Sequence, residues 1–341
     1  MLAVTCCVVL PLLAVGCGGG SDDSAERAEQ ISQSATDEHN EDVRRDLDRM
    51  REEQEQQAAA ETVTAPQVAG SEEIDQPQDG AVEGTETTEV ADSSATGALF
   101  SAADRKSFNK LAASTLGREG VAVATIRGTR LQSLGSLKSG VAWSTAKVPV
   151  AMAAIAAGTG NEADLRRAIT ASDNAAAERL WASLGTPRSA AAAATEQLRK
   201  SGDNRTTVQS QRLLSGYTAF GQTDWRLTDQ ARFVAGMSCT AQGRKVLGLM
   251  GQVTGGQRWG LGQAGTSQRF KGGWGPGVTP GSGQGWLERQ MGIIIVGGRP
   301  VVVAIATDGP GHEADTVALT RIAKWVASHV DAKAVPRQPS C

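Results

Sequence analysis

The sequence predicts an α+β domain, in which one antiparallel sheet is built from both ends of the domain around an all-α region, behind a disordered acidic tail. Three observations carry this prediction. Strand-like segments lie at both ends of residues 98–335, helical apolar spacing fills the middle, and glycine-rich turns separate the last strands. Strands at both ends of a helical middle are expected to form one sheet with helices packed on it.

The individual elements follow from local patterns. The apolar run after Ser144 reads as a helix that Gly158 ends, and Pro149 near its start predicts an irregular first turn. The central helices are alanine-rich and the last helix is amphipathic. In chain order, we expect a helix at 102–116, strands at 120–127 and 130–134, helices at 144–157, 165–170, 175–184, 189–200 and 227–237, strands at 267–273, 285–296 and 300–307, and a helix at 313–330.

Charge divides the chain into two parts. Residues 21–95 carry a net charge of −17, whereas residues 96–341 carry +14. Residues 62–96 are rich in Thr, Glu, Gly and Pro and contain no aromatic residue, so we expect 17–97 to be a partly helical, disordered tether. The basic domain favours anionic partners such as wall polymers. Nucleic acid is not expected as a partner, because no recognition motif accompanies the charge.

The N-terminus contains an apolar run that is short for a membrane span and ends in Leu13-Ala14-Val15-Gly16-Cys17. This stretch resembles a bacterial lipoprotein signal, although no Lys or Arg precedes it. The resemblance implies a signal peptide at 1–16, a lipid on Cys17, and an extracytoplasmic domain anchored to the cell membrane. An ordinary secretory signal or an N-terminal anchor is the alternative.

Five cysteines are present. Cys6 and Cys7 would leave with the signal peptide and Cys17 would carry the lipid, so Cys239 and Cys341 remain as a pair in an oxidising compartment. A disulfide between them, a buried thiol and a free terminal thiol all stay open, because sequence does not supply the geometry.

The stretch Trp143-Ser144-Thr145-Ala146-Lys147 places a hydroxyl and an amine three residues apart. Positions i and i+3 share a helix face, so Lys147 can bring its nitrogen near the Ser144 hydroxyl. A lysine can take a serine proton at neutral pH if burial or nearby cations lower its pKa. Because Ser-x-x-Lys arises by chance about once in a chain of this size, the motif needs partners.

Two further motifs follow in order. Ser172-Asp173-Asn174 follows a short predicted helix, and Lys271-Gly272-Gly273 lies on a predicted strand. Together with the Ser144 motif they resemble the three motifs of the penicillin-recognising serine enzymes, namely the class A β-lactamases and related penicillin-binding proteins. The resemblance covers about 98–330 and implies a β-lactamase-like serine hydrolase domain at 98–335.

The resemblance implies an acyl-enzyme at Ser144 on a β-lactam or a peptidoglycan peptide. Lys147 would be the base, and Ser172 with Lys271 would relay a proton to the leaving nitrogen. Convergence of the two lysines would itself depress an amine pKa and attract a substrate carboxylate. The backbone N–H groups of Ser144 and Trp274 would form the oxyanion hole.

Other residues of the motifs have implied or simpler roles. Asn174 and Gly273 would hold the substrate, and Asp173 would tie loops together. Read without the resemblance, the second motif is a good helix cap and Lys271 is a surface cation. No metal or cofactor is expected: His39, His312 and His329 lack ligand spacing and are expected to be solvated or at helix ends.

Three departures from the family pattern shape the expected activity. The loop expected at 208–221 has no acid, whereas class A enzymes carry a glutamate there for deacylation, and the nearest acids are Asp203 and Asp224. Gly272 replaces a hydroxyl residue that would bind a substrate carboxylate. Only 28 positions separate Ser144 from Ser172, which predicts a wider site for a bulkier or polymeric substrate.

These departures favour acylation with slow deacylation. The alternatives are a catalytically impaired wall-binding or scaffold lipoprotein of the same fold, and a basic binder of wall polymers.

Overall fold

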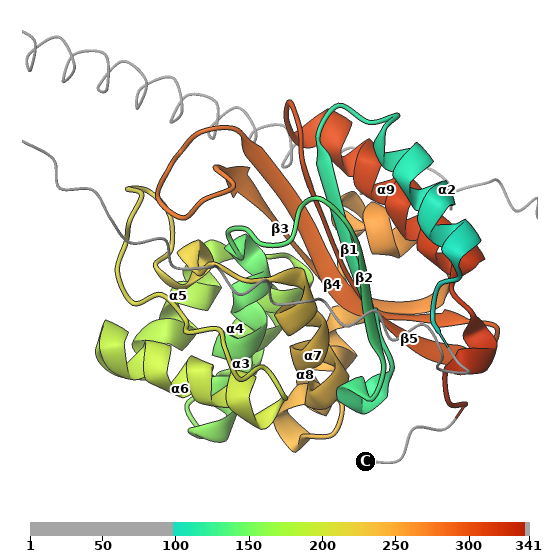
Figure 1. Cartoon of the computed structure of the whole chain (residues 1–341). Helices are drawn as coiled ribbons and strands as arrows, with labels where there is room; N and C mark the ends of the chain where they lie inside the picture. Colours follow the sequence, from blue (N-terminus) through green and yellow to red (C-terminus); the bar gives the residue numbers. More distant parts are fainter. Residues whose placement is uncertain (1–97, 338–341) are drawn as a thin grey trace, which may run out of the picture. The chain divides into compact units, whose positions relative to one another are not determined.

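The computed structural model describes residues 98–337, shown in colour in Figure 1. The expected signal peptide, the lipid site at Cys17 and the tether at 17–97 lie outside these residues and stay predictions. Cys341 also lies outside them. Cys239 is disulfide-bonded, and its pairing with Cys341 stays a prediction.

Five strands form one antiparallel sheet in the order β2-β1-β5-β4-β3. The first two strands come from the start of the domain and the other three from its end. The two ends are joined by the pairing of β1 with β5, which sets Val121 opposite Ile305. The predicted α+β class is confirmed. The strands are β1 (Arg118–Ala124), β2 (Leu131–Gly135), β3 (Thr266–Pro276), β4 (Trp286–Val296) and β5 (Arg299–Asp308).

Helices cover both faces of the sheet (Figure 1). The first and last described helices pack on one face, and the six central helices form the α region on the other. Within the described part of the chain, none of the helices is both long and apolar enough to cross a membrane. The helices are α2 (Ala102–Ala112), α3 (Lys147–Ala156), α4 (Glu162–Thr170), α5 (Asn174–Ala182), α6 (Pro187–Lys200), α7 (Leu227–Met237), α8 (Ala241–Met250) and α9 (His312–His329).

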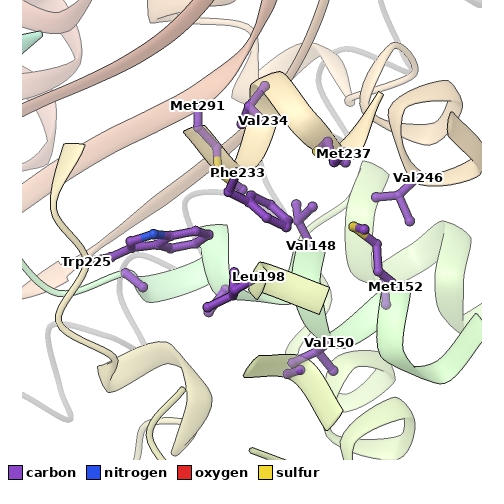
Figure 2. Close-up of a cluster of buried hydrophobic side chains, with 14 of the residues drawn as sticks. Val148, Val150, Met152, Leu198, Trp225, Phe233, Val234, Met237, Val246 and Met291 are labelled. Atoms are coloured by element: carbon purple, nitrogen blue, oxygen red, sulfur yellow. The ribbon is translucent and has the colours of Figure 1, made fainter. Parts of the chain in front are cut away.

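The central helix α3 is buried along most of its length. Val148, Val150 and Met152 are all fully buried, and Figure 2 shows them among side chains of α6, α7, α8 and β4. Burial of each such side chain contributes about 1.5–3 kcal/mol. Because Lys147 is the first residue of α3, the core of the α region fixes the position of its backbone.

Two elements differ from the prediction. Helix α8 was not expected, since Gly243 and Gly248 lower its helix propensity. Helix α2 ends at Ala112, and the chain then turns, so that Leu116 is 84% exposed. The expected irregular start of the Ser144 helix is confirmed: Trp143–Ala146 form a 3-10 turn, η2, directly before α3.

Candidate active site

Ser144 lies on η2, where the backbone is tied down on two sides. The Ala142 N–H donates to the Thr223 carbonyl at 2.7 Å, and the Val141 N–H donates to the Val278 carbonyl at 3.2 Å. Trp143 has a φ of 46°, in the left-handed region that bulky residues rarely adopt. Such backbone strain persists only where the surroundings impose it, and it is concentrated at functional sites.

A buried arginine holds the segment that leads into η2. Arg289 of β4 donates to the carbonyls of Gly140 and Val141 at 2.6 and 3.0 Å, to that of Trp225 at 3.0 Å, and to Gln230 Oε1 at 2.9 Å. These bonds join β4 and α7 to the segment at Gly140 and Val141 that precedes η2. This positioning residue was not predicted from the sequence, although three consecutive polar residues inside an otherwise apolar strand are a signal.

The network continues beneath the candidate nucleophile. Gln230 Nε2 donates to Thr145 Oγ1 at 3.0 Å, and the Thr145 hydroxyl donates to the Ala142 carbonyl. Both side chains are buried. A network whose members satisfy one another fixes one conformation, so the turn that carries Ser144 is held from below.

Strand β3 passes directly against η2. A Cβ placed on Gly273 would lie 2.7 Å from the Ser144 nitrogen and 2.9 Å from the Thr145 nitrogen, so the close approach requires glycine here. A Cβ on Gly272 would lie 3.5 Å from Trp259, which is an ordinary contact. Position 272 therefore has room for a side chain, and steric crowding does not explain why it lacks a hydroxyl.

The Ser172 hydroxyl lies between the two lysines that the sequence singled out. Lys147 Nζ donates to Ser172 Oγ at 3.2 Å, to Asn174 Oδ1 at 2.7 Å, and to the Ser172 carbonyl. Lys271 Nζ donates to Ser172 Oγ at 2.8 Å and to the Gly272 carbonyl at 2.8 Å. The second and third motifs thus meet at one hydroxyl.

Burial lowers the pKa of both amines. The pKa of Lys147 falls to about 7 because the side chain is removed from water, against the opposing charges of Asp173 and Glu178. The pKa of Lys271 falls well below its usual value, first through burial and second through Lys147. The expected depression is present, but burial contributes more to it than repulsion between the lysines.

The relation between Ser144 and Lys147 differs from the expectation. Within residues 98–337 the Ser144 hydroxyl has no hydrogen-bond partner, because Lys147 is bonded to Ser172 and Asn174 instead. Ser172 has a φ of 58°, and its carbonyl accepts from the Lys147 amine. In unliganded active sites, catalytic hydrogen bonds are often long and tighten only with substrate.

The second motif is a helix cap and also part of the site. Asp173 is the N-cap of α5, accepts from the Ala176 N–H at 2.9 Å, and pairs with Arg167 at 2.6 Å. Burial acts to raise the pKa of Asp173, but the hydrogen bond and the ion pair outweigh it and lower the pKa. The cap places Ser172 and Asn174 beside Lys147, and Asp173 ties this segment to α4.

The acids near the loop at 208–221 are used elsewhere. Buried Asp203 accepts from Trp225 Nε1 at 2.9 Å, and Asp224 accepts from Ser139 Oγ at 2.5 Å. Glu178, which the sequence analysis missed, lies one turn beyond Asn174 on α5 and pairs with Arg212 of this loop at 3.0 Å. In the described part of the chain, no group of three or more His, Cys, Asp or Glu could hold a metal ion.

His312 lies at a helix end, one of the two positions expected from sequence. It begins α9 and is hydrogen-bonded to Glu288, which is fully buried. Burial raises the pKa of Glu288 to about 7. Burial acts to lower the pKa of His312, but the bond and the charge of Glu288 outweigh it and raise the pKa.

Comparison with known proteins supports the fold that the three motifs predicted. No protein-family model and no curated protein sequence matches the chain. Among solved structures, the class A β-lactamase of the last common ancestor of Gram-negative bacteria is 20% identical with a TM-score of 0.51, covering 67% of this chain and 99% of that one. The chromosome-encoded β-lactamase of Vibrio parahaemolyticus is 14% identical with a TM-score of 0.52, covering 66% and 98%. Similarity at these identities shows that the chain has a class A β-lactamase-like fold.

Proposed function

We propose, from the class A β-lactamase-like fold and the hydrogen-bonded Lys147–Ser172–Lys271 group, that this protein is a serine hydrolase that forms an acyl-enzyme at Ser144. Its substrate is a β-lactam or a peptidoglycan-type amide. The observation that carries the proposal is the Ser172 hydroxyl bonded to two buried amines, one of which has a pKa of about 7. Such an amine is partly neutral at physiological pH and can accept a proton.

The proposed reaction moves one proton through three groups. Lys147 takes the Ser144 proton as Oγ bonds to the carbonyl carbon, and the resulting oxyanion lies against the N–H groups of Ser144 and Trp274. The carbon–nitrogen bond then breaks. The leaving nitrogen takes the Ser172 proton, which Lys147 replaces through the hydrogen bond at 3.2 Å. Lys271 fixes the Ser172 hydroxyl and supplies positive charge for a substrate carboxylate.

Deacylation is proposed to be slow. Asp203 and Asp224 are engaged in structural hydrogen bonds, and Glu178 is paired with Arg212. The same observation favours a second candidate, a binding or scaffold protein that keeps the fold without turnover. The net charge of +14 over residues 96–341 favours anionic wall polymers as further partners.

A labelling experiment separates these candidates. The full chain is incubated with a fluorescent penicillin, and intact mass and released product are followed. A long-lived adduct is expected on the wild type and on Ser189→Ala, an exposed serine of α6, and no adduct on Ser144→Ala. A wild type that neither acquires an adduct nor releases product would reject the enzyme in favour of the scaffold, and rapid product release would reject slow deacylation.

We further propose that Cys17 carries a lipid that anchors the chain on the outer face of the cell membrane. The support is the sequence Leu13 to Cys17. In a bacterial host, detergent-phase partitioning of the wild type should be lost in Cys17→Ser. Equal partitioning of both chains would contradict a lipid at this residue.

A further inference from the structure

We propose that the domain carries a carbohydrate-binding track beside the candidate active site. It is formed by Trp274, His312 and Trp286 and leads into an open groove at Leu116. Its ligand is a run of neutral sugar rings in a polymeric substrate. The inference rests on the proposed function for the reacting end of that substrate, and adds a site for the part that does not react.

The track begins on β3, one residue beyond the glycine that packs against the Ser144 turn. A Cβ on Gly273 would lie 2.7 Å from the Ser144 nitrogen, and successive strand side chains point to opposite faces, so the Trp274 ring leaves β3 on the face that position 272 shares with Trp259. The Trp274 ring lies 5.5 Å from that of His312, and His312 lies 6.4 Å from Trp286, between ring centroids. Trp259 flanks this line at 5.9 Å from Trp274. The rings therefore form an unbroken series along this face of the sheet, from β3 past the start of α9 to the start of β4.

The rings are only partly covered. Trp259, Trp274 and Trp286 each keep part of their surface in solvent, and grouped exposed aromatic surface usually marks a binding site. A sugar ring offers an apolar C–H face that packs on an aromatic face, and hydroxyls at its edge that need donors and acceptors. The pairing of His312 with Glu288 fixes the imidazole in the middle of the series and gives it a polar edge.

The series ends in a shallow, open groove of about 470 Å³. Trp286 forms part of its wall, together with the exposed Leu116 and the ion pair of Arg118 with Asp308. Arg118 Nε donates to Asp308 Oδ2 at 2.7 Å. Because the two charges offset each other, the groove offers a donor and an acceptor with little net charge, which suits neutral hydroxyls better than an anionic polymer.

The test measures binding in the full chain carrying Ser144→Ala, so that it does not depend on acylation. A tetramer of β-1,4-linked N-acetylglucosamine is titrated while tryptophan fluorescence and binding heat are recorded. Saturable binding is expected, with an affinity that stays constant from about 50 to about 500 mM NaCl because the ligand is neutral.

The variants locate the binding site. Adding Trp286→Ala should weaken the affinity about tenfold, and Leu116→Ala about threefold. The matched control is Val317→Ala, an apolar residue of α9 that is 58% exposed and should leave affinity unchanged. Because Leu116 is 84% exposed, its variant tests the groove without disturbing the core.

Three results would overturn the track. The first is that binding does not saturate at about 10 mM tetramer, and the second is that neither groove variant changes the affinity for the tetramer. The third is that a synthetic 62–96 peptide binds more tightly than the tetramer and that the same variants abolish the binding of this peptide. The two proposals fail separately. Loss of sugar binding with intact labelling of wild-type Ser144 rejects the track alone, and absence of labelling with intact sugar binding rejects only the acyl-enzyme.

Discussion

Replacing Lys147 by methionine should abolish labelling of Ser144 and yet stabilise the folded domain at neutral pH. The amine has a pKa of about 7 in the folded protein against 10.5 in the unfolded chain. Keeping this buried amine in its less protonated state costs the folded protein about 5 kcal/mol at pH 7. The lost hydrogen bonds to Ser172 and Asn174 offset about 3 kcal/mol of this. A net gain of about 2 kcal/mol is expected.

The pH dependence follows from the same pKa values. Between the two values the unfolded chain holds a proton on Lys147 that the folded protein lacks, so wild-type stability rises with pH. The rise is about 1.4 kcal/mol per unit, so from about pH 7.5 to about pH 9.5 the stability of Lys147→Met relative to wild type should fall by about 3 kcal/mol and the wild type should become the more stable chain. Burial of Lys271 acts on both chains and cancels in the comparison, whereas the part of its pKa shift that comes from Lys147 is lost in the variant.

Urea unfolding of both chains at the two pH values measures this difference. The matched control is Lys200→Met, on an exposed lysine of α6. A stability difference between wild type and Lys147→Met that does not change with pH would show that Lys147 is charged in the folded protein. That result would remove the physical basis for its role as base.

Three further outcomes are expected. Labelling of Ser144 by a penicillin should become about tenfold faster from pH 6 to pH 8, because only neutral Lys147 accepts the proton; a flat stopped-flow profile would contradict this. Gly273→Ala should abolish labelling because its Cβ would displace η2, whereas Gly272→Ser should speed labelling about tenfold because it adds a hydroxyl for the substrate carboxylate. Equal labelling rates for the two variants would contradict the close contact at 273 and the free space at 272. Arg289→Met should lower the free energy of unfolding by about 3–5 kcal/mol in urea, because buried carbonyls lose their donors; a change below about 1 kcal/mol would show that the bonds are dispensable.

Much of the fold was predictable because its signals are local. Apolar runs bounded by glycines identified all five strands, and α7 has the predicted bounds. Helix α8 escaped because its two glycines weaken the local signal, and the 3-10 form of η2 depends on contacts with distant loops.

The site was predictable only in part. The three motifs contain the residues that meet at Ser172, because their order along the chain carried the resemblance. The bonds of Arg289 and the ion pair of Glu178 with Arg212 join residues 34 or more positions apart, and no spacing rule connects them. Lys147 is bonded to Ser172 and Asn174 in place of Ser144, and these partners lie 25 and 27 positions away, so the spacing within the first motif does not reveal them.

Arg289 alone holds the segment that leads into η2, and this affects how variants of the protein would rank in a mutational screen. A screen that measures only labelling would rank Arg289 with the reacting groups, because its loss would release the turn that holds the nucleophile. A scan that records cellular abundance together with activity would separate the two classes. Lys147 variants should stay abundant and inactive, whereas Arg289 variants should be lost on both scales.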